Sequence, residues 1–466
     1  MSGISLMITF IIAIVVMIVM ISKLNIHPFL SILTVSLVFG LIGGIPLVDQ
    51  TLADGTKVSG IATVIGQGFS STFTSIGIVI IFGTIIGAML EKTGAALKLA
   101  DMVIHVVGQK RPALAMELMG WIVSVPVFCD SGFVILNPIR RALVKRTAVS
   151  SVAMSVCLSA GLYASHVFIP PTPGPIAAAA TLGVGEQLLL VMGLGALASI
   201  PCLIVAYFYA RWIGQKERAK DEADAVDAEG KVETYEELLK SYGELPSGFM
   251  SLAPIIIPVI LMALSNVSSV LKWQGALDQI LLFLGTPIIA LAVGVIFGIL
   301  LLSQRKALGD LYEIINDSLK TAGPILFITA AGGVLGKVIS STSLVAFITE
   351  NAPALQTMGV FFPFVVAAVL KTAQGSSTVA ITTTAGIVSP LLPVLGMGTP
   401  VGAALAVIAI GAGAMTVSHA NDSYFWVVTN FGGMTTEQGY RTQTVVTLLE
   451  GLAGMFGVWI LSLVLL

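Results

Sequence analysis

Charged residues are scarce in this sequence. Only 10% of the 466 residues are Asp, Glu, Lys or Arg, whereas 56% are hydrophobic, and this composition excludes a soluble globular domain of this size. The net charge is -2 and no long basic stripe occurs, so nothing predicts nucleic-acid binding. We therefore predict an integral membrane protein, for which lipid is the surrounding partner.

Cysteine pairs and the common catalytic motifs are also missing from the sequence. The three cysteines, Cys129, Cys157 and Cys202, lie in apolar or small-residue surroundings without CxxC spacing, which argues against a disulfide framework or a zinc site. There is no GxxxxGK loop for ATP, no HExxH and no GxSxG, so neither a pump driven by ATP nor a hydrolase is indicated. We predict no enzymatic activity, no cofactor and no metal, and we interpret Cys157 and Cys202 as small core residues.

Long uncharged runs recur from end to end of the chain. Each is close to the roughly 20 residues that a helix needs to cross about 30 Å of hydrocarbon, so helices are expected and not barrel strands. The first run, Gly3 to Ser22, follows no Lys or Arg and precedes no small-residue cleavage site, which favours a retained helix over a signal peptide. The predicted fold class is all-α, a polytopic membrane protein of about 12 transmembrane helices. The candidate spans are residues 3–22, 28–48, 72–91, 112–129, 149–168, 187–210, 251–268, 279–302, 323–340, 358–372, 400–417 and 443–466.

One charged stretch divides the chain near its middle. Arg211 to Glu244 holds 16 of the 48 charged residues, which are 23 basic and 25 acidic, and it must therefore be an aqueous loop or a helical linker. The expected organisation is a first transmembrane repeat at 1–210, a charged linker at 211–247 and a second transmembrane repeat at 248–466.

A constant shift of 245 residues relates the two transmembrane segments. It places Gly87-Ala88-Met89-Leu90 on Gly332-Gly333-Val334-Leu335, Lys92 on Lys337, and Asp130-Ser131 on Gly375-Ser376. A duplication of this kind is typical of secondary transporters, in which the substrate site lies between the halves near the bilayer midplane.

Four polar clusters interrupt the apolar surroundings, two in each half. They are VFCDSGFVILNP (Val127 to Pro138), SHVFIPPTPGP (Ser165 to Pro175), KTAQGSSTVAITTT (Lys371 to Thr384) and SHANDSYFW (Ser418 to Trp426). Four prolines fall among residues 170 to 175, so the helix that begins near residue 149 must stop there. A stop at bilayer depth is tolerated where the freed backbone faces protein or a water-filled cavity.

Two of these clusters predict broken helices whose tips meet near the centre of the membrane. The hydroxyl residues after Gly375 are expected to cap the start of a half-helix, and such an N-terminus attracts a carboxylate or phosphate. The predicted tips are Gly375, Ser376, Ser377 and Thr378 in the second half, and Asp130, Ser131 and Gly132 in the first. A single membrane hydroxyl usually bonds only to the preceding turn, but the whole set, with glycines in both halves, favours a solute site.

Ionisable residues inside the polar clusters are candidates for proton coupling. A charge within a span costs several kcal/mol unless it is paired or hydrated, and a carboxylate or imidazole can change charge between the two sides. The candidates are Asp130, then Asp422, with His166 and His419, each of which has the alternative role of a structural donor to a carbonyl. Lys371 either balances the charge of a substrate or extends to an interface, and the second reading is the preferred one.

The sequence resembles the gluconate permease (GntP) family. The stretches that carry the resemblance are CDSGFVILNPI (Cys129 to Ile139), PPTPGPIAAA (Pro170 to Ala179), QGSSTVAITTTAGIVSP (Gln374 to Pro390) and SHANDSYFW. The length, the central charged linker and the order of the motifs agree, so the resemblance covers nearly the whole chain. It does not identify the member of the family.

The resemblance implies uptake of a small hydroxylated carboxylate with protons across the inner membrane of a bacterium. Gluconate is the best-known substrate of the family, while relatives carry other sugar acids and one branch takes D-serine. The wider ion-transporter superfamily implies two inverted repeats with broken helices and re-entrant hairpins, homodimers and an elevator motion. Sodium-coupled relatives have Ser-Asn-Thr tips, whereas the turns here read Asp-Ser-Gly and Gly-Ser-Ser-Thr; this difference favours protons and leaves sodium open.

The sequence thus predicts a secondary transporter for gluconate or a related carboxylate. Protonation of Asp130 or Asp422 would admit the anion, because two negative charges are unfavourable together in a poorly hydrated site. The alternatives are a carrier of D-serine or another sugar acid, and a passive anion channel. The carboxylate is expected on the half-helix amides and on Ser376, Ser377 and Thr378, and the substrate hydroxyls on Asp130, Ser131, Asn421 and Thr172.

Overall fold

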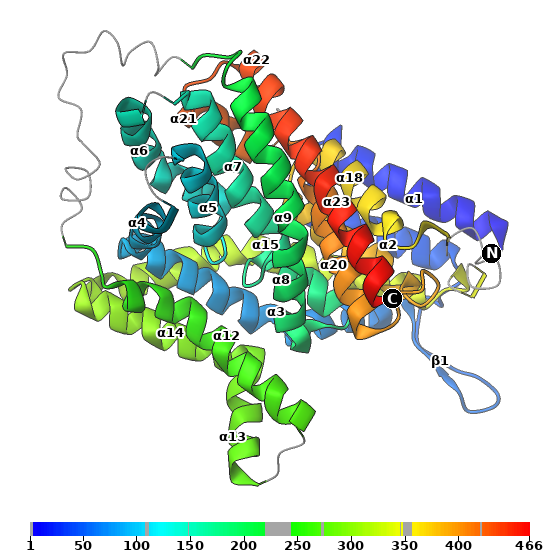
Figure 1. Cartoon of the computed structure of the whole chain (residues 1–466). Coiled ribbons are helices and arrows are strands. Elements are labelled where there is room, and N and C mark those ends of the chain that lie inside the picture. The colour runs from blue at the N-terminus through cyan, green and yellow to red at the C-terminus, as the bar shows by residue number, and fades with distance from the viewer. Residues whose placement is uncertain are drawn as a thin grey trace.

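The computed structural model describes residues 3–107, 111–147, 149–219, 244–271, 275–344, 346–347, 357–419 and 422–466. In this part the chain is helical apart from one short antiparallel hairpin of β1 and β2 (Figure 1). The elements of the first half are α1 Ile4–Ser22, α2 Pro28–Ile42, β1 Gln50–Thr51, β2 Lys57–Val58, α3 Ile61–Lys92, α4 Ala95–Val107, α5 Pro112–Val123, α6 Cys129–Thr147, α7 Ser151–Phe168, α8 Pro173–Thr181, η1 Gly185–Gln187 and α9 Leu188–Ile213.

The second half begins after the charged linker, most of which lies outside the described residues. Its first helices, α12 to α14, form an arm that ends in α13 (Figure 1). The elements are α12 Gly248–Leu271, α13 Ala276–Gly285, α14 Pro287–Gln304, η2 Leu308–Asp310, α15 Leu311–Ser340, α18 Phe361–Gln374, α19 Ser377–Val388, η3 Ser389–Leu391, α20 Pro400–Met415, α21 Ser423–Phe431, α22 Thr436–Gly439, the π-turn η4 Tyr440–Thr444 and α23 Val445–Leu465.

The all-helical, polytopic fold class is confirmed, although fewer helices than expected have full membrane length. Among the described residues, seven helices are long and apolar enough to cross a membrane, or eight if the bent pair of α3 and α4 counts as one span. Other predicted spans, such as 112–129, 358–372 and 400–417, are apolar helices of 10–17 residues. At 1.5 Å per residue a 12-residue helix reaches about 18 Å, short of the roughly 30 Å of a bilayer.

The helix breaks follow the local rules of glycine and proline. α7 ends at Phe168 and α8 begins at Pro173, so the proline-rich segment stops the helix as predicted. Gly375 ends α18 in the left-handed conformation with φ 87°, which favours glycine because it has no Cβ. Phe168, Pro173 and Gly375 are buried, so the helix ends at both breaks lie inside the protein.

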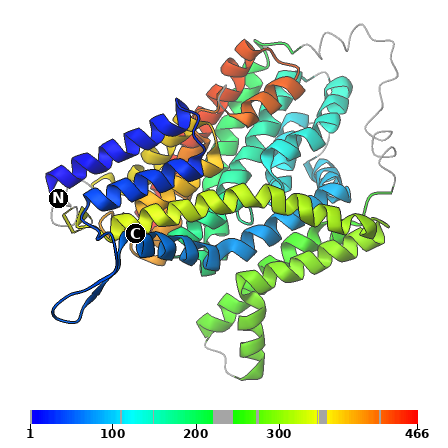
Figure 2. The same ribbon diagram turned by 180° about the vertical axis from the view of Figure 1, so that it is seen from behind.

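The same order of elements occurs in both halves. The long helices α3 and α15 lie side by side in both views (Figures 1 and 2). In the first half α3 is followed by the series α5 to α9, and in the second half α15 is followed by the corresponding series α18 to α21 and α23. The matched glycines play similar parts: a Cβ at Gly87 would lie 2.3 Å from the carbonyl oxygen of Pro126, and one at Gly332 would lie 2.8 Å from that of Thr382. This correspondence supports the expected duplication, which remains a prediction.

The core lies around α7 and α20. Every residue of α7 is buried, and so is every residue of α20 except Pro400 and Val401. Helix α7 packs against α6, and α20 packs against α19, so these two buried helices support the broken helices.

Candidate functional site

A cavity of about 260 Å³ lies where the tips of α6, α19 and α21 meet. Helices α7 and α15 complete its wall, so both halves of the chain contribute to it. We call it the central cavity. Its lining residues are Phe128, Cys129, Asp130, Tyr163, His166, Pro324, Ile325, Ile328, Ser376, Ser377, Thr378, Val379, Asp422, Ser423 and Tyr424.

The N-terminus of α19 opens onto the central cavity. Ser376 is the N-cap, and its hydroxyl oxygen accepts a hydrogen bond from the backbone N–H of Val379 at 3.3 Å. Ser377 and Thr378 form the first turn beside it and line the same cavity. A helix N-terminus carries partial positive charge and backbone N–H groups, so this end of α19 is suited to a carboxylate.

Asp130 faces the α19 tip from the first turn of α6. Its side chain lines the central cavity, and its Oδ1 atom is buried without a hydrogen-bond partner among the described residues. A buried carboxylate oxygen without a donor is poorly compensated as an anion. Asp130 is therefore placed to hold a proton or to accept a hydrogen bond from a solute.

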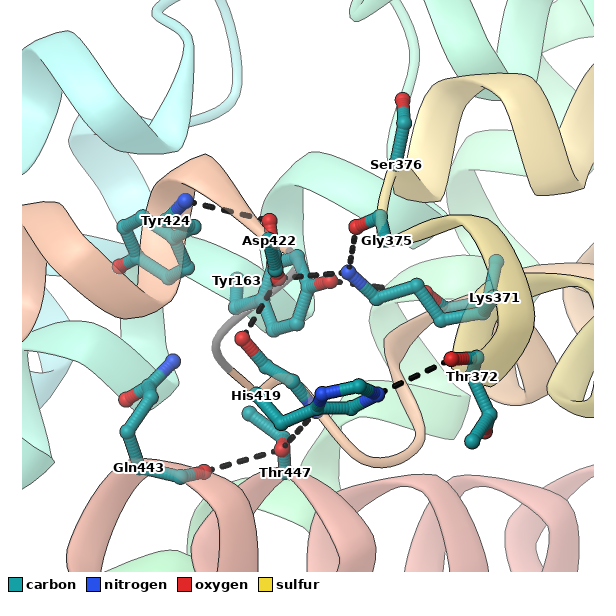
Figure 3. A network of polar contacts seen from close by, with 12 residues as sticks. Tyr163, Lys371, Thr372, Gly375, Ser376, His419, Asp422, Tyr424, Gln443 and Thr447 are labelled. Atoms are coloured by element: carbon teal, nitrogen blue, oxygen red, sulfur yellow. Dashed lines mark hydrogen bonds and ion pairs between the residues drawn. The ribbon is translucent and has the colours of Figure 1, made fainter. Parts of the chain in front are cut away.

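Asp422 is held by a buried ion pair. Its Oδ2 lies 2.5 Å from Nζ of Lys371 and accepts a hydrogen bond from the hydroxyl of Ser418 at 2.5 Å, while its Oδ1 accepts one from the N–H of Tyr424 at 3.1 Å. Figure 3 shows Lys371 reaching from α18 to Asp422 and to the carbonyl oxygen of Gly375. The ammonium thus ties the start of α21 to the turn before α19.

The preferred reading of Lys371 as a side chain that extends to an interface is wrong. The side chain has 0% exposure, against 6% for Asp422. A lysine near the end of an apolar run usually extends to water, but here a carboxylate 51 residues later in the chain supplies a partner inside the protein. Lys371 therefore acts on the site through Asp422, which lines the cavity.

Two tyrosines of the site were not singled out from the sequence. The ring centroids of Tyr163 and Tyr424 lie 5.1 Å apart, and Nζ of Lys371 lies 5.8 Å from the centroid of Tyr163. Tyr163 precedes His166 by three residues on α7, so helical spacing was the available signal. Tyr424 belongs to the polar cluster that contains Asp422.

The histidines have different surroundings. His166 is buried and lines the central cavity, and its Nδ1 has no hydrogen-bond partner among the described residues. His419 does not line the cavity, and its Nε2 lies 2.9 Å from the carbonyl oxygen of Thr372. The contact of His419 matches the structural alternative, whereas His166 remains a candidate for proton coupling.

Other expected site residues lie apart from the cavity or outside the description. Thr172 donates its hydroxyl hydrogen to the carbonyl oxygen of Ile169 at 2.7 Å and does not line the cavity. Gly132 serves packing, since a Cβ there would lie 2.5 Å from Leu162 Cδ2. The side chain of Ser131 and the whole of Asn421 lie outside the described residues.

The three cysteines lie inside the protein. Cys129, Cys157 and Cys202 are free and buried, and Cys157 and Cys202 lie in the hydrophobic core as expected. In the described ranges, no group of three or more His, Cys, Asp or Glu side chains is arranged to hold a metal ion.

A larger hollow of about 340 Å³ lies at the other end of α19. Lys337 is the one charged residue of its lining, and the hydroxyls of Thr181, Ser340 and Ser389 already donate to backbone carbonyls. The central cavity is the better candidate site because it combines two carboxylates, a paired ammonium and a helix N-terminus.

Comparisons with known proteins identify the relatives of the chain. The sequence model described as "GntP family permease" matches residues 5–464. An uncharacterized permease of Haemophilus influenzae is 34% identical over 91% of this chain and 85% of its own. The Gnt-II system L-idonate transporter of Escherichia coli is 30% identical, over 89% and 91% of the two chains, and a gluconate permease of Zymomonas mobilis is 28% identical over 97% of each.

One solved structure has a similar fold. The Alcanivorax borkumensis YdaH transporter, which has an unusual topology in its crystal structure, superposes with a TM-score of 0.61, and the match covers 94% of this chain and 97% of that chain. The sequence identity is 16%, so the likeness concerns the fold alone.

Proposed function

Because this chain belongs to the GntP family of permeases, we propose that it takes up gluconate or a related small hydroxylated carboxylate by proton symport. The chain is a multi-pass membrane transporter and not an enzyme. The relatives named for gluconate and for L-idonate support a sugar acid as the substrate class.

The observation that carries this proposal is the composition of the central cavity. The end of α19 offers partial positive charge and the hydroxyls of Ser376, Ser377 and Thr378 to a carboxylate. Asp130 and the oxygens of the two tyrosines can accept hydrogen bonds from substrate hydroxyls; the tyrosine hydroxyls already donate to backbone carbonyls. A volume of about 260 Å³ is close to the lower limit of ordinary small-molecule pockets, which suits a substrate of this size.

The charges of the cavity supply a reason for coupling to protons. Lys371 neutralises Asp422, so an ionised Asp130 would leave one uncompensated negative charge beside an incoming anion. Protonation of Asp130 removes that repulsion and makes the acid a donor to the substrate. Binding of the anion and of the proton therefore favour each other, which is the thermodynamic requirement for symport.

The membrane context and assembly state are part of the same proposal. The bacterial relatives include an inner membrane permease of Escherichia coli, and we place this chain in a bacterial inner membrane as a homodimer. In this scheme the two repeats, joined by the linker at 211–247, are inverted relative to each other and carry the tips that form the cavity.

Three other functions make different predictions. If the chain is a D-serine carrier of the same family, unlabelled D-serine would inhibit the uptake of labelled gluconate as strongly as we expect sugar acids to inhibit it. A passive anion channel would need no obligatory proton carrier, so Asp130→Asn would leave its downhill flux intact. A carrier coupled to sodium would accumulate substrate under a sodium gradient at equal pH.

The test is uptake of labelled gluconate into proteoliposomes under an inward proton gradient, with and without a protonophore. Accumulation that collapses with the protonophore is the expected result, and an excess of unlabelled L-idonate, other hydroxy acids or D-serine then ranks the substrates. Equilibration without accumulation would contradict proton symport, and absence of flux for every acid would contradict the substrate class.

A further inference from the structure

Two glutamates lie inside the protein, outside the central cavity. Glu117 of α5 and Glu450 of α23 both have 0% exposure, and neither lines the cavity. In the described part of the chain, no hydrogen-bond partner exists for any of their carboxylate oxygens and no ion pair involves them. Ionisable side chains so placed in a membrane protein are costly, and they commonly mark proton relays.

The helices that carry the two glutamates, α5 and α23, both pack against α7 and α9. Helix α5 crosses α7 so closely that a Cβ at Gly161 would lie 1.9 Å from the carbonyl oxygen of Glu117. From α9, the thiol of Cys202 donates to the carbonyl oxygen of Glu450 at 3.2 Å. Cys157 of α7 is buried and lies within electrostatic range of both carboxyl groups.

The charges that face this pair do not compensate it. The two carboxyl groups lie within electrostatic range of each other, and the groups beside them include Cys157, Cys202 and Tyr424. Arg211 is a cation in this region, and among the described residues it forms no ion pair with either glutamate. Two nearby buried carboxylates without a paired cation cannot both be ionised at low cost. The pair is therefore suited to hold at least one proton.

Polar contacts lead from the central cavity toward Glu450. The hydroxyl of Tyr424 donates to the carbonyl oxygen of Ser159 at 3.0 Å, and the hydroxyl of Ser159 donates to Oε1 of Gln443 at 2.7 Å. Nε2 of Gln443 is buried without a partner among the described residues. Gln443 lies in the π-turn η4, directly before the helix that carries Glu450, and π-turns within helices are frequent at functional sites.

A second connection starts at Asp422. Its Oδ2 accepts the hydroxyl hydrogen of Ser418, and the N–H of Ser418 donates to the hydroxyl of Thr447 at 2.9 Å. Thr447 in turn donates to the carbonyl oxygen of Gln443 at 2.9 Å. Figure 3 shows Gln443 and Thr447 close to the ion pair of the cavity, and Thr447 stands one helical turn before Glu450.

From these contacts we infer that Glu117 and Glu450 form a second proton-binding site that carries one of the transported protons. One carboxylate binds a proton and becomes the neutral acid; on the other side of the membrane it releases the proton and becomes the carboxylate again, so no other reactant is consumed. This inference rests on the proposed proton symport. The competing explanation is that both acids stay protonated and only fill the core.

The test compares Glu117→Gln and Glu450→Gln with the wild type in proteoliposomes, because glutamine keeps the shape of the protonated acid. Glu313→Gln, at an exposed position of α15, is the matched control. Exchange of labelled for unlabelled substrate at equal pH on both sides reports folding and the substrate site. Accumulation under an inward proton gradient reports coupling. The number of protons carried with each substrate molecule follows from the substrate gradient at which net substrate flux stops under that proton gradient.

We expect both glutamine variants to exchange substrate but to lose one coupled proton. With a pH difference of about one unit, each coupled proton contributes about tenfold to the limiting accumulation ratio, so that ratio should fall about tenfold while Glu313→Gln matches the wild type. Wild-type accumulation ratios in both glutamine variants would overturn the inference and leave proton symport intact. A wild type that does not accumulate substrate would instead refute the proposed function itself.

A second measurement covers the case in which the glutamine variants do not fold. Infrared difference spectra of reconstituted Asp130→Asn protein, recorded after a pH change, should contain the carbonyl band of a buried carboxylic acid that gains and loses a proton. Absence of any titrating band of this kind between about pH 5 and 9 would overturn the inference, because permanently protonated acids give a constant signal.

Discussion

Replacement of Lys371 by Met should destabilise the protein strongly, because it leaves the buried carboxylate of Asp422 without its cation. The ion pair is 2.5 Å long and its two side chains are 0% and 6% exposed. Loss of one partner of such a pair typically costs 3–5 kcal/mol, about what we expect here. That corresponds to roughly a 100- to 5,000-fold shift in the folding equilibrium.

The double variant Lys371→Met, Asp422→Asn separates the pair from other effects of the lysine. Removal of both charges abolishes the buried unpaired charge, so the double variant should recover about 2 kcal/mol relative to the sum of the single variants. The double variant would not recover fully, because the two oxygens of Asp422 also accept hydrogen bonds from Ser418 and Tyr424 and an asparagine can replace only part of these contacts.

Unfolding by sodium dodecyl sulfate in mixed micelles, followed by tryptophan fluorescence, measures these free energies. Lys320→Met is the control, because Lys320 and Asp317 form an ion pair with side chains that are 77% and 60% exposed, and exposed pairs contribute little. Additive effects of the two substitutions in the double variant would refute the reasoning, since the charges would then not be coupled.

Three further predictions concern the tips and the helix contacts. Asp130→Asn should remove one coupled proton, so the limiting accumulation of gluconate under a pH difference of one unit should fall about tenfold while exchange persists; an accumulation ratio equal to that of the wild type would contradict the role of Asp130. Gly375→Ala should cost about 1–2 kcal/mol and weaken substrate affinity, because φ 87° is unfavourable for alanine; Gly375→Asn should be milder, and equal effects of the two would count against backbone strain. Gly161→Ala should destabilise the protein by at least about 1–3 kcal/mol, since its Cβ would lie 1.9 Å from the Glu117 carbonyl oxygen, whereas Gly66→Ala, which meets nothing within 4 Å, should be neutral or stabilising in the same unfolding assay.

Local chemistry explains the parts of the site that were predictable. Gly375 and the prolines after residue 169 act through their own backbones, so the ends of α18 and α7 could be located from the sequence. The hydroxyls after Gly375 cap the next helix for the same local reason. Asp130, His166 and Asp422 were found because ionisable residues are rare in apolar surroundings.

Long-range partners explain what was missed. Lys371 was misread because its counter-ion belongs to another segment, and no local rule reports such pairing. Glu117 and Glu450 lie within the predicted spans 112–129 and 443–466, so a search for single charges inside spans would have found them. Short helices such as α5 and α20 were predicted as full spans because hydropathy does not tell where a buried helix ends.

The complete burial of α7 also constrains how the protein is made. α7 carries Ser159, Tyr163 and His166, and Ser159 and Tyr163 hydrogen-bond to Gln443 and to the carbonyl oxygen of Ala414, both from the second half of the chain. When the ribosome has released only the first half into the membrane, those polar side chains have no final partners. The first half should therefore be an unfinished folding intermediate, in which these hydroxyls lack their native partners until the second half of the chain is inserted.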